Sequence, residues 1–427
     1  MINYCKRCLY GDHHPLGIQI DYNGLCSGCF IHEEKNLIDW DYKENELKDI
    51  LSKYKNVKND YYDCVIPVNG NSDSYFVVDI IKNKYGLNPL LVTYNSHFNT
   101  KIGIRNLARL VTKLDCDHLI QTVSPSIVKR ITKIAFKELG DIYWHVNGGN
   151  QTFPVQVATK FNIPLVIWGV NGWLDQVGMF SHHDNAEMSK KVRKEHSLRG
   201  EDAEELLLNK EQLSKQDIQP FVYPSDSQLE ASRVRGLYLG NFLRWDAQKQ
   251  SESMIEKFGY ETKKEDRTFN NYETINCWNN QGVHDYLKYI KFGYGKATDH
   301  ACRDIRLERM TREEGIDLAK KYDPIIPETS IKIFLGWIEM DRSEFNSIIE
   351  LHRNLNIWEK DLNGNWFQKE PIKKNQDIEA IDNLRLNSNN PRKYIETEIL
   401  EIEDPDKGYI LMGRNYIDQE NYKAIED

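Results

Sequence analysis

Four cysteines near the start of the chain constrain its fold more than any other feature. They form two couples in the pattern C-x2-C-x17-C-x2-C, at Cys5, Cys8, Cys26 and Cys29. Each couple places two sulfurs on one tight turn, so the four thiolates can close a tetrahedral shell around Zn2+. Two disulfides are the alternative, but no secretory signal precedes the couples and no apolar stretch is long enough to span a bilayer. We therefore expect a cytoplasmic protein with a structural zinc site.

A shell of four sulfurs leaves no open position for a substrate, so its expected role is to fold a segment too short to build its own core. Catalysis is then expected elsewhere. The formal net charge of -9 argues against a protein that binds nucleic acid over a basic face. The remaining cysteines are interpreted as buried or incidental thiols: Cys64, Cys116, Cys277 and Cys302.

After the cysteines, short apolar runs alternate with longer segments of helical spacing. The runs are expected to be strands over residues 63–68, 89–93, 118–121 and 164–168. The segments between them are expected to be helices over residues 75–86, 103–114, 126–139 and 154–161. This order predicts an α/β fold with a doubly wound parallel sheet, in which ligands bind outside the carboxyl ends of the strands. The loops expected to converge there span residues 69–74, 94–100 and 169–173.

From about residue 224 periodic apolar residues continue without clear strands, which predicts a mostly helical region. Its expected elements span residues 229–259, 283–292, 299–310, 312–322 and 342–353. Alternation at roughly strand period predicts a small hairpin over residues 394–401. We divide the chain into a zinc-binding module (1–36), a connecting helix (37–60), a nucleotide-binding domain (61–223), a mostly helical substrate or partner region (224–372) and a C-terminal extension (373–427).

The turn after the first expected strand is a candidate phosphate loop. A turn rich in Gly and Asn lets successive N–H groups point at one place, so a phosphate can be held without a lysine. Asp73 can hold Mg2+ against the phosphates, and the Ser74 hydroxyl can add a hydrogen bond. By spacing alone the motif is weak, and an ordinary turn before a helix is the simpler interpretation. The loop consists of Asn69, Gly70, Asn71, Ser72, Asp73 and Ser74.

Residues 66–75 resemble the S-G-G-x-D-S motif of the ATP pyrophosphatases, the PP-loop superfamily that includes GMP synthetase, asparagine synthetase and the tRNA thiolases. More narrowly, the chain resembles the N-acetyl sugar amidotransferases of bacterial surface-glycan biosynthesis. The resemblance runs from the first cysteine to about residue 370 and is specific because many blocks occur in order. Besides the cysteine couples, these blocks span residues 87–94, 153–158, 163–169, 175–182, 288–301 and 310–315.

The phosphate loop departs from the family motif at two positions. Asn69 and Asn71 stand where the motif has Ser and a second Gly. Asn tolerates the left-handed backbone better than other non-glycine residues, so the loop can survive at Asn71. The cost is a side chain where a backbone must approach pyrophosphate closely. Retained ATP use and weakened or lost catalysis both stay open at this point.

The resemblance implies an AMP-forming amidotransferase, a ligase that makes a C–N bond in LPS O-antigen or flagellin glycan biosynthesis. ATP would adenylate the acetamido oxygen of a nucleotide-linked sugar, and ammonia would then displace AMP to leave an acetamidino group. The implied cofactors are ATP, Mg2+ and structural Zn2+. The cysteines lack a nucleophile-elbow context, so the implied partners are a separate glutaminase and an ammonia-channelling barrel subunit. Neither nucleic acid nor membrane insertion is expected.

Candidate site residues follow from the expected edge of the sheet. Residues 69–74 would bind ATP, with Asp73 and Ser74 catalytic, and Tyr94 and Asn95 would flank the adenine. His145 and His182 lie in expected loops at the same edge and are further catalytic candidates, although a loop histidine is more often structural. The candidates for binding the sugar nucleotide are Gln176, Lys291, Lys296, His300, Arg303 and Arg306.

The basic residues of this set allow two interpretations. If a helix begins at Asp299, then His300, Arg303 and, less squarely, Arg306 share a face that suits a diphosphate. The alternative is a surface salt-bridge network with Asp304 and Glu308.

Two other functions compete with the sugar amidotransferase. A zinc-containing PP-loop enzyme that modifies tRNA would need a catalytic cysteine near the ATP site and a basic surface, and the acidic balance counts against it. A catalytically impaired PP-loop scaffold protein would account for Asn69 and Asn71. Formation of AMP from ATP separates the scaffold from the enzymes, and retention of a nucleotide sugar rather than tRNA separates the two enzymes.

Overall fold

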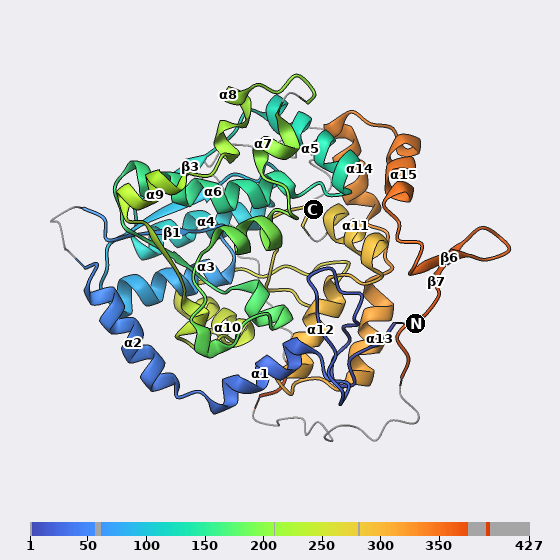
Figure 1. The fold of residues 1–427 in the computed structure, drawn as a ribbon, viewed down its shortest axis with the longest axis horizontal. Helices are drawn as coiled ribbons and strands as arrows, with labels where there is room; N and C mark the ends of the chain where they lie inside the picture. The colour runs from blue at the N-terminus through green and yellow to red at the C-terminus, as the bar shows by residue number, and fades with distance from the viewer. Residues whose placement is uncertain (1, 56–60, 209, 281, 375–389, 393–427) are drawn as a thin grey trace.

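A computed structural model describes residues 2–55, 61–208, 210–280, 282–374 and 390–392 of the 427-residue chain. A parallel sheet with helices on both faces occupies one side of the molecule, and a mostly helical region with the cysteine segment against it occupies the other (Figure 1). Within these residues no helix is both long and apolar enough to cross a membrane. Most of the expected C-terminal extension, including the hairpin predicted over residues 394–401, lies outside the described residues.

The sheet has five parallel strands in the order β3-β2-β1-β4-β5. The first four strands along the chain match the expected ones, which confirms the predicted doubly wound sheet. The strand order reverses beside β1, so the switch point at which such sheets bind ligands lies at the carboxyl ends of β1 and β4. The strands are β1 (Cys64–Pro67), β2 (Pro89–Tyr94), β3 (His118–Gln121), β4 (Leu165–Trp168) and β5 (Arg235–Tyr238).

The fifth strand corrects the expectation of helix over residues 229–259. Only the end of α9 (Asp226–Ser232) and α10 (Ala247–Phe258) are α-helical there, while β5 joins β4 in the sheet. The four residues of β5 read Arg-Gly-Leu-Tyr, a run too short to show strand periodicity, and its glycine weakens the β preference. The sheet therefore continues beyond residue 223, the expected end of the nucleotide-binding domain.

Different helices cover the two faces of the sheet because side chains alternate along each strand. Ile66 of β1 faces a core shared with α3 (Ser72–Val78), α4 (Lys101–Leu114) and α10, whereas Val65 faces a core shared with α6 (Trp144–Lys160). α6 is longer than the helix expected over residues 154–161, because Pro154 lies inside it rather than at its start.

The second half is mostly helical, as predicted. α14 was not expected: its N-cap residue, Pro327, has no side chain that can cap a helix, and its Thr and Ile residues favour strands. A hairpin of β6 (Trp358–Lys360) and β7 (Trp366–Gln368) extends from the body (Figure 1) and was also missed. The helices are α11 (Val283–Phe292), α12 (Lys296–Arg306), α13 (Arg312–Tyr322), α14 (Glu328–Ile338) and α15 (Arg342–Leu351).

The cysteine segment packs against α12 and α13 (Figure 1), where its Leu9 and Tyr10 share a core with Ile305 and Ile316. It leads into α1 (Ser27–Leu37) and then α2 (Trp40–Ser52), which is the expected connecting helix. The remaining helices are α5 (Pro125–Leu139), α7 (Ala203–Leu207) and α8 (Lys215–Ile218), with short π or 3-10 segments η1 (Asp79–Lys84), η2 (Trp173–Val177), η3 (His182–Asp184), η4 (Val192–Ser197), η5 (Gln219–Phe221) and η6 (Leu239–Asn241).

Candidate functional site

The candidate phosphate loop joins β1 to α3 at the carboxyl edge of the sheet. Gly70 has a left-handed backbone with φ of 80°, and an added Cβ would lie 2.9 Å from the Gly103 carbonyl oxygen. Only glycine meets both conditions, so Gly70 makes the turn. Asn71 is the N-cap residue of α3 and is extended, with φ of -81° and ψ of 164°. Asn71 therefore does not use the left-handed backbone that Asn was expected to tolerate there, and the turn does not require the second Gly of the family motif.

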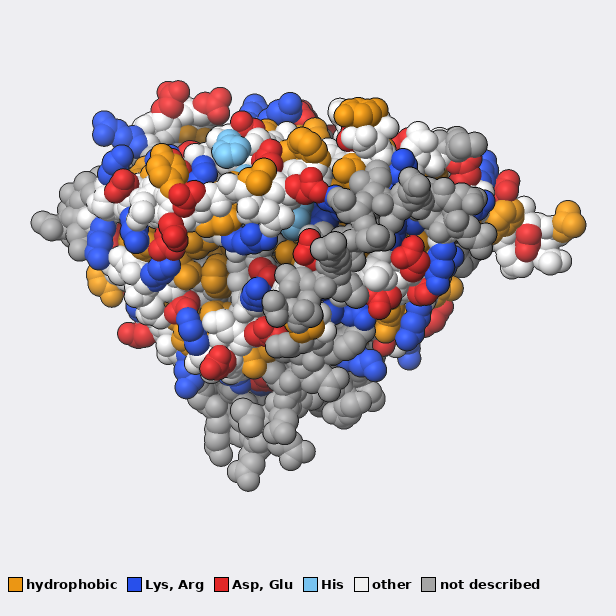
Figure 2. Space-filling view, turned by 90° about the horizontal axis from the view of Figure 1, so that it is seen from below, with side chains coloured by type: hydrophobic (Ala, Val, Ile, Leu, Met, Phe, Trp, Pro, Cys, Tyr) orange, Lys and Arg blue, Asp and Glu red, His pale blue; other side chains and the backbone are white. Residues whose placement is uncertain are grey.

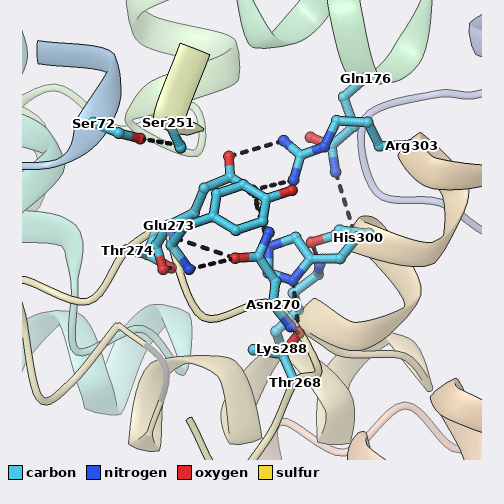
Figure 3. Close-up of polar contacts among 12 residues, drawn as sticks. Ser72, Gln176, Ser251, Thr268, Asn270, Glu273, Thr274, Lys288, His300 and Arg303 are labelled. Atoms are coloured by element: carbon cyan, nitrogen blue, oxygen red, sulfur yellow. Dashed lines mark hydrogen bonds and ion pairs between the residues drawn. The ribbon is translucent and has the colours of Figure 1, made fainter. Parts of the chain in front are cut away.

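Asn69 replaces the Ser of the family motif with a side chain that ties the loop together. Its Oδ1 accepts hydrogen bonds from the Asn71 N–H at 3.1 Å and from the Ser74 hydroxyl at 3.0 Å. Its own N–H donates to Ser74 Oγ at 3.1 Å. Ser72 is buried, and the Ser251 hydroxyl of α10 donates to its Oγ at 2.7 Å (Figure 3). Ser72 and Ser74 therefore hold the loop and the start of α3 in place.

Asp73 is the charged group of the loop. Its Oδ1 accepts a hydrogen bond from the Ser74 N–H at 2.9 Å. The side chain is exposed to solvent, yet surrounding protein desolvates the carboxylate and the Glu273 carboxylate repels it, so its pKa rises to about 6. A carboxylate with a raised pKa gains free energy when a cation neutralises it, which makes Asp73 a suitable Mg2+ ligand.

A cleft and a smaller cavity adjoin the loop and share Asn69, Tyr94 and Asn150 as walls. The cleft has about 920 Å³ of empty space and runs from the loop to the end of β4 at Trp168 and Gly169. The cavity is narrow, with a volume of about 30 Å³, which is room for a water-sized group. Amides offer both donors and acceptors, so its wall suits a polar, uncharged group. That wall contains Asn69, Asn95, Asn99, Asn150 and Asn276.

Tyr94 and Asn95 both line this cavity at the end of β2. Tyr94 is buried, and its hydroxyl lies 3.0 Å from His145 Nδ1. Asn95 organises the following turn, since its Oδ1 accepts hydrogen bonds from the His97 N–H at 3.0 Å and from Asn99 Nδ2 at 2.8 Å. Their contact with adenine stays a prediction.

Neither candidate catalytic histidine is among the described residues that line the cleft or the cavity. The expectation that His145 lies in a loop is wrong, because it lies on α6, where burial lowers its pKa to about 3. His182 lies in η3 with its ring edge-on to Trp40, 6.1 Å between ring centres, and burial lowers its pKa to about 4. Both rings are therefore neutral at pH 7, and a catalytic role for either stays a prediction.

A polar network from the second half lies beside the loop. Glu273 is its acidic centre, and Arg303 of α12 pairs with both of its carboxylate oxygens, with Nη1 2.9 Å from Oε1 (Figure 3). His300 Nδ1 lies 2.6 Å from the Thr268 hydroxyl, and His300 Nε2 lies 3.9 Å from Glu273 Oε2. The Glu273 charge helps to raise the pKa of Asp73, and Asn276 of the same segment donates to the Asn69 carbonyl oxygen, so this segment lies against the loop.

Asp299 is the centre of a second polar cluster. Its Oδ1 accepts hydrogen bonds from the Tyr10 hydroxyl at 2.9 Å and from Gln176 Nε2 at 3.2 Å. Lys288 pairs with its Oδ2. Lys296 begins α12, three residues before the expected start at Asp299, and burial and the Lys288 charge lower its pKa. Gln176 and Lys296, two predicted sugar-nucleotide residues, thus lie in one charged cluster.

Two other predicted sugar-nucleotide residues make contacts elsewhere. Arg306 is buried beside the cysteines, with Nη2 3.6 Å from Cys26 Sγ and Nη1 donating to the Gln176 carbonyl oxygen at 2.9 Å. Lys291 Nζ donates to the Leu139 carbonyl oxygen at 3.2 Å.

The expected shared face of α12 is therefore wrong for Arg306. A helix turns about 100° per residue, so Arg306 points roughly 120° away from His300, toward the cysteines. The alternative salt-bridge network is also wrong in its partners, because Arg303 pairs with Glu273 rather than with Asp304 or Glu308.

The four paired cysteines form a closed cluster, with all four sulfurs within 4.8 Å of one another. Cys5 Sγ lies 3.9 Å from Cys29 Sγ, and Cys8 Sγ lies 3.5 Å from Cys26 Sγ. Zn–S bonds of about 2.3 Å in a tetrahedron place sulfurs roughly 3.8 Å apart, whereas a disulfide would place them about 2 Å apart. The side chains therefore fit a four-coordinate Zn2+ site.

The alternative enzyme would need a reactive cysteine and a basic surface. Cys277 hydrogen-bonds with Ser96 and Tyr143 of the cavity wall, but burial raises the pKa of its thiol, which is the opposite of an activated nucleophile. On the face drawn in Figure 2, the described Lys and Arg side chains are interspersed with Asp and Glu. Neither feature favours tRNA modification.

Sequence reasoning missed Tyr10, Glu273, Asn276 and Lys288 as residues of this region. Glu273 and Asn276 lie in an irregular segment without periodicity, and Asn276 Nδ2 donates to the Asn69 carbonyl oxygen at 3.1 Å. Tyr10 looks like a core residue of the cysteine module. Only Lys288 carried a signal, because it opens the block at residues 288–301 that was compared with the family.

Residues 252–370 match the family model for the C-terminal domain of WbpG-like LPS biosynthesis proteins. No curated protein matches the chain. Similar solved structures include NMN synthetase from Francisella tularensis, with 16% identity over 52% of this chain and 96% of that chain, and a TM-score of 0.27. Another is NH3-dependent NAD synthetase from Campylobacter jejuni in complex with the nitrate ion, with 17% identity, the same coverage and a TM-score of 0.27. At such TM-scores no conclusion is drawn from either structure.

The matched region contains α11 to α15 and supplies Glu273, Asp299 and Arg303 to the polar clusters. It therefore brings charged side chains to the edge of the parallel sheet. Through residues 252–370, this chain is similar to the C-terminal domain of WbpG-like LPS biosynthesis proteins.

Proposed function

We propose that the protein is an ATP-dependent amidotransferase that converts the acetamido group of a nucleotide-linked N-acetyl sugar to an acetamidino group in surface polysaccharide biosynthesis. The observation that carries the proposal is the contact between the loop at the switch point of the sheet and the region that matches the WbpG-like domain, where Asn276 Nδ2 donates to the Asn69 carbonyl oxygen at 3.1 Å. The loop suits a nucleotide, and the region beside it offers charged groups to an acceptor.

The reaction balances as two displacements. An amide oxygen is a poor leaving group, so the acetamido oxygen first attacks the α-phosphorus of ATP, and the bond to pyrophosphate breaks. Ammonia then adds to the activated carbon, AMP leaves with the former amide oxygen, and loss of a proton gives the amidine. Amide, ammonia and ATP thus yield amidine, AMP and pyrophosphate.

The loop residues would serve the first displacement. Gly70 makes a turn without a side chain, and the internal bonds of Asn69 to Asn71 and Ser74 preorganise the loop before any ligand binds. Asp73 would hold Mg2+, which neutralises charge as pyrophosphate separates. The cleft beside Tyr94 would accept the nucleoside.

The second half would bind the acceptor. Arg303 is held by Glu273, and Lys288 is held by Asp299, so their charges are already oriented when a diphosphate arrives. Lys296 Nζ has no hydrogen bond in the described part of the chain and is the cation best able to turn to an anionic acceptor.

We also propose that ammonia comes from a separate glutaminase. The cysteines outside the cluster are poor candidates for glutamine hydrolysis, because a nucleophilic cysteine needs an accessible, low-pKa thiol. Cys302 is buried and accepts a hydrogen bond from the Leu9 N–H. Burial raises the pKa of the thiols of Cys64, Cys116 and Cys277.

The test is release of AMP and pyrophosphate by purified protein with Mg2+, ATP, ammonium and a panel of UDP-linked N-acetyl sugars. We expect AMP only with a subset of sugars, with mass spectrometry showing replacement of one oxygen by NH, and no AMP from Asp73→Ala. ATP binding without AMP release from any sugar would instead favour the impaired scaffold. Release of AMP only with tRNA would favour the tRNA-modifying enzyme.

A further inference from the structure

Tyr10 lies in the cysteine module in the sequence, but its hydroxyl contacts Asp299 and Gln176, two residues of the proposed acceptor site. It lies two residues after Cys8, and only 2% of its surface is exposed. Its ring packs edge-on against His14 and Tyr294, with 4.8 and 5.7 Å between ring centres, and the Arg306 guanidinium lies 5.5 Å from its ring centre. Packing on three sides fixes the direction of its hydroxyl.

That hydroxyl joins three elements that are distant in sequence. It donates to Asp299 Oδ1 of α12 at 2.9 Å and accepts from Gln176 Nε2 of η2 at 2.9 Å. Gln176 Nε2 also lies 3.2 Å from Asp299 Oδ1, so the three polar groups form a closed triangle. Lys288 of α11 pairs with the other oxygen of Asp299. One phenol therefore fixes the orientation of a carboxylate, a carboxamide and, through the carboxylate, an ammonium group.

The cluster has polar capacity that its own contacts do not use. Gln176 Oε1 and Lys296 Nζ have no hydrogen-bond partner among the described residues, and both side chains are partly exposed. The charges of Asp299 and Glu273 both act on Lys296, and Glu273 also acts on Asp73. Lys296 is thus within electrostatic reach of both Asp299 and Glu273. An amide oxygen and an ammonium suit the hydroxyl groups and the diphosphate of a sugar nucleotide.

The cysteine cluster holds α12 in the position that this contact requires. Cys302 of α12 accepts a hydrogen bond from the Leu9 N–H at 3.3 Å, and Arg306 approaches Cys26 Sγ at 3.6 Å. Arg312 of α13 donates to the carbonyl oxygens of Cys5 and Cys8 at 3.3 and 3.2 Å. The module is thus fastened to both helices on either side of Tyr10.

We infer that Tyr10 is a positioning residue of the acceptor site, and that the cysteine module therefore serves acceptor binding as well as folding. The inference rests on the proposed function for the identity of the acceptor. Tyr10 acts through Asp299 and Gln176, which it orients toward the sugar nucleotide. The cysteine module thus forms one side of the acceptor site and is joined to α12, the helix that carries Lys296 and Asp299.

The test compares Tyr10→Phe with Tyr4→Phe. Tyr4 belongs to the same module, but its hydroxyl donates to the Glu370 carbonyl oxygen at 2.9 Å, outside this cluster. With ammonium as nitrogen donor, we expect Tyr10→Phe to raise KM for the acceptor about 5- to 10-fold, as loss of one hydrogen bond predicts. We expect KM for ATP, kcat and bound zinc per chain to stay within twofold, and Tyr4→Phe to change none of them.

A second measurement separates this inference from the proposed function. Hydrogen–deuterium exchange of zinc-loaded protein should be faster in Tyr10→Phe at residues 173–178 and 296–300 and unchanged in Tyr4→Phe. If the wild type forms no AMP but exchange changes in this way, the proposed function fails and the positioning role stands. Equal exchange in both variants, equal rises in the two KM values, or loss of zinc from Tyr10→Phe would overturn the positioning role.

Discussion

The sulfurs of the cysteine cluster have partners, whereas some buried oxygens beside the phosphate-loop cleft have none among the described residues. In the cluster the sulfurs are turned toward one another and receive N–H groups, as when Cys5 Sγ accepts from the N–H of Cys8 at 3.4 Å and of Cys26 at 3.3 Å. In the cleft region the buried Oδ1 atoms of Asn71 and Asn276 have no partner among the described residues. Asp73 carries an exposed charge with a raised pKa.

This difference fits a folding role for the cluster and the proposed reaction at the cleft. A buried acceptor without a donor costs about 1–3 kcal/mol, and a ligand in the cleft would recover that cost. The cysteine cluster retains none of its sulfurs for a substrate, since a tetrahedral metal would use all four. Changes in the cluster should therefore affect stability first, and changes in the cleft should affect activity first.

The largest effect is expected from Cys29→Ser. Four-cysteine zinc sites contribute apparent binding free energies on the order of 10 kcal/mol, and this one also anchors α12 and α13. We expect loss of bound zinc, a much lower thermal unfolding midpoint and no activity. The control is Cys116→Ser at a partly exposed single cysteine, which should change neither zinc content nor unfolding. Normal zinc content and unfolding of Cys29→Ser would show that the cluster is not a zinc site.

Asp73→Asn should separate activity from stability. We expect AMP formation to fall by about 10²-fold or more, because the metal ligand is lost. The folded protein binds the Asp73 proton more tightly than the unfolded chain does, since the pKa rises from 3.8 to about 6. The ionised carboxylate therefore costs stability fully above pH 6, and that cost disappears as the pH falls toward 3.8.

The unfolding midpoint of Asp73→Asn should thus exceed that of the wild type at pH 7.5, and the two midpoints should converge near pH 4. Differential scanning calorimetry without ATP or Mg2+ measures this directly. A midpoint for Asp73→Asn below the wild type at pH 7.5 would mean that Asp73 holds the fold rather than a ligand.

The same two regions show what the sequence can and cannot predict. The cysteine cluster depends on four residues within 25 positions whose spacing carries its geometry, and the four sulfurs lie together as predicted. Strands β1, β2 and β4 were also visible, because buried parallel strands are continuous apolar runs, whereas the half-exposed β3 was predicted from the alternation of strands and helices. β5 was not, since its pairing with β4 rather than its own composition makes it a strand.

The polar clusters of the second half were only partly predictable. Arg303 was proposed for the site, but its partner Glu273 lies 30 residues away in an irregular segment that no periodicity identifies. Arg306 was assigned to the same face, but its guanidinium lies beside Cys26 Sγ, on the other side of α12. Such contacts form when segments that are distant in the sequence pack together. A local sequence pattern does not show which segments will do so.

Glu273→Gln tests whether a charge of the second half acts on Asp73 of the phosphate loop. Desolvation is the main cause of the raised pKa of Asp73, and repulsion from Glu273 adds to it. Removing that charge should lower the pKa of Asp73, so the acidic limb of the pH profile of AMP formation should move to lower pH by less than one unit. Glu261→Gln is a matched control, because Glu261 pairs with Arg105 and Arg109 rather than facing Asp73. An unmoved limb would mean that the Glu273 charge does not reach Asp73.

The smallest effect is expected from Asn71→Gly, which restores the second glycine of the family motif. Asn71 is already extended, so glycine relieves no backbone strain. The added flexibility of glycine lowers the stability of the fold by roughly 0.5–1 kcal/mol. Removal of the unpartnered Asn71 Oδ1 acts in the opposite direction. We expect KM for ATP to change less than about threefold, within the range that such small terms allow. Gly70→Ala is the opposite case, because φ of 80° and a Cβ contact of 2.9 Å would distort the turn and raise KM for ATP well beyond that. A strong gain of activity in Asn71→Gly would show that the Asn71 side chain obstructs the phosphate, and that the loop of this protein is impaired rather than adapted.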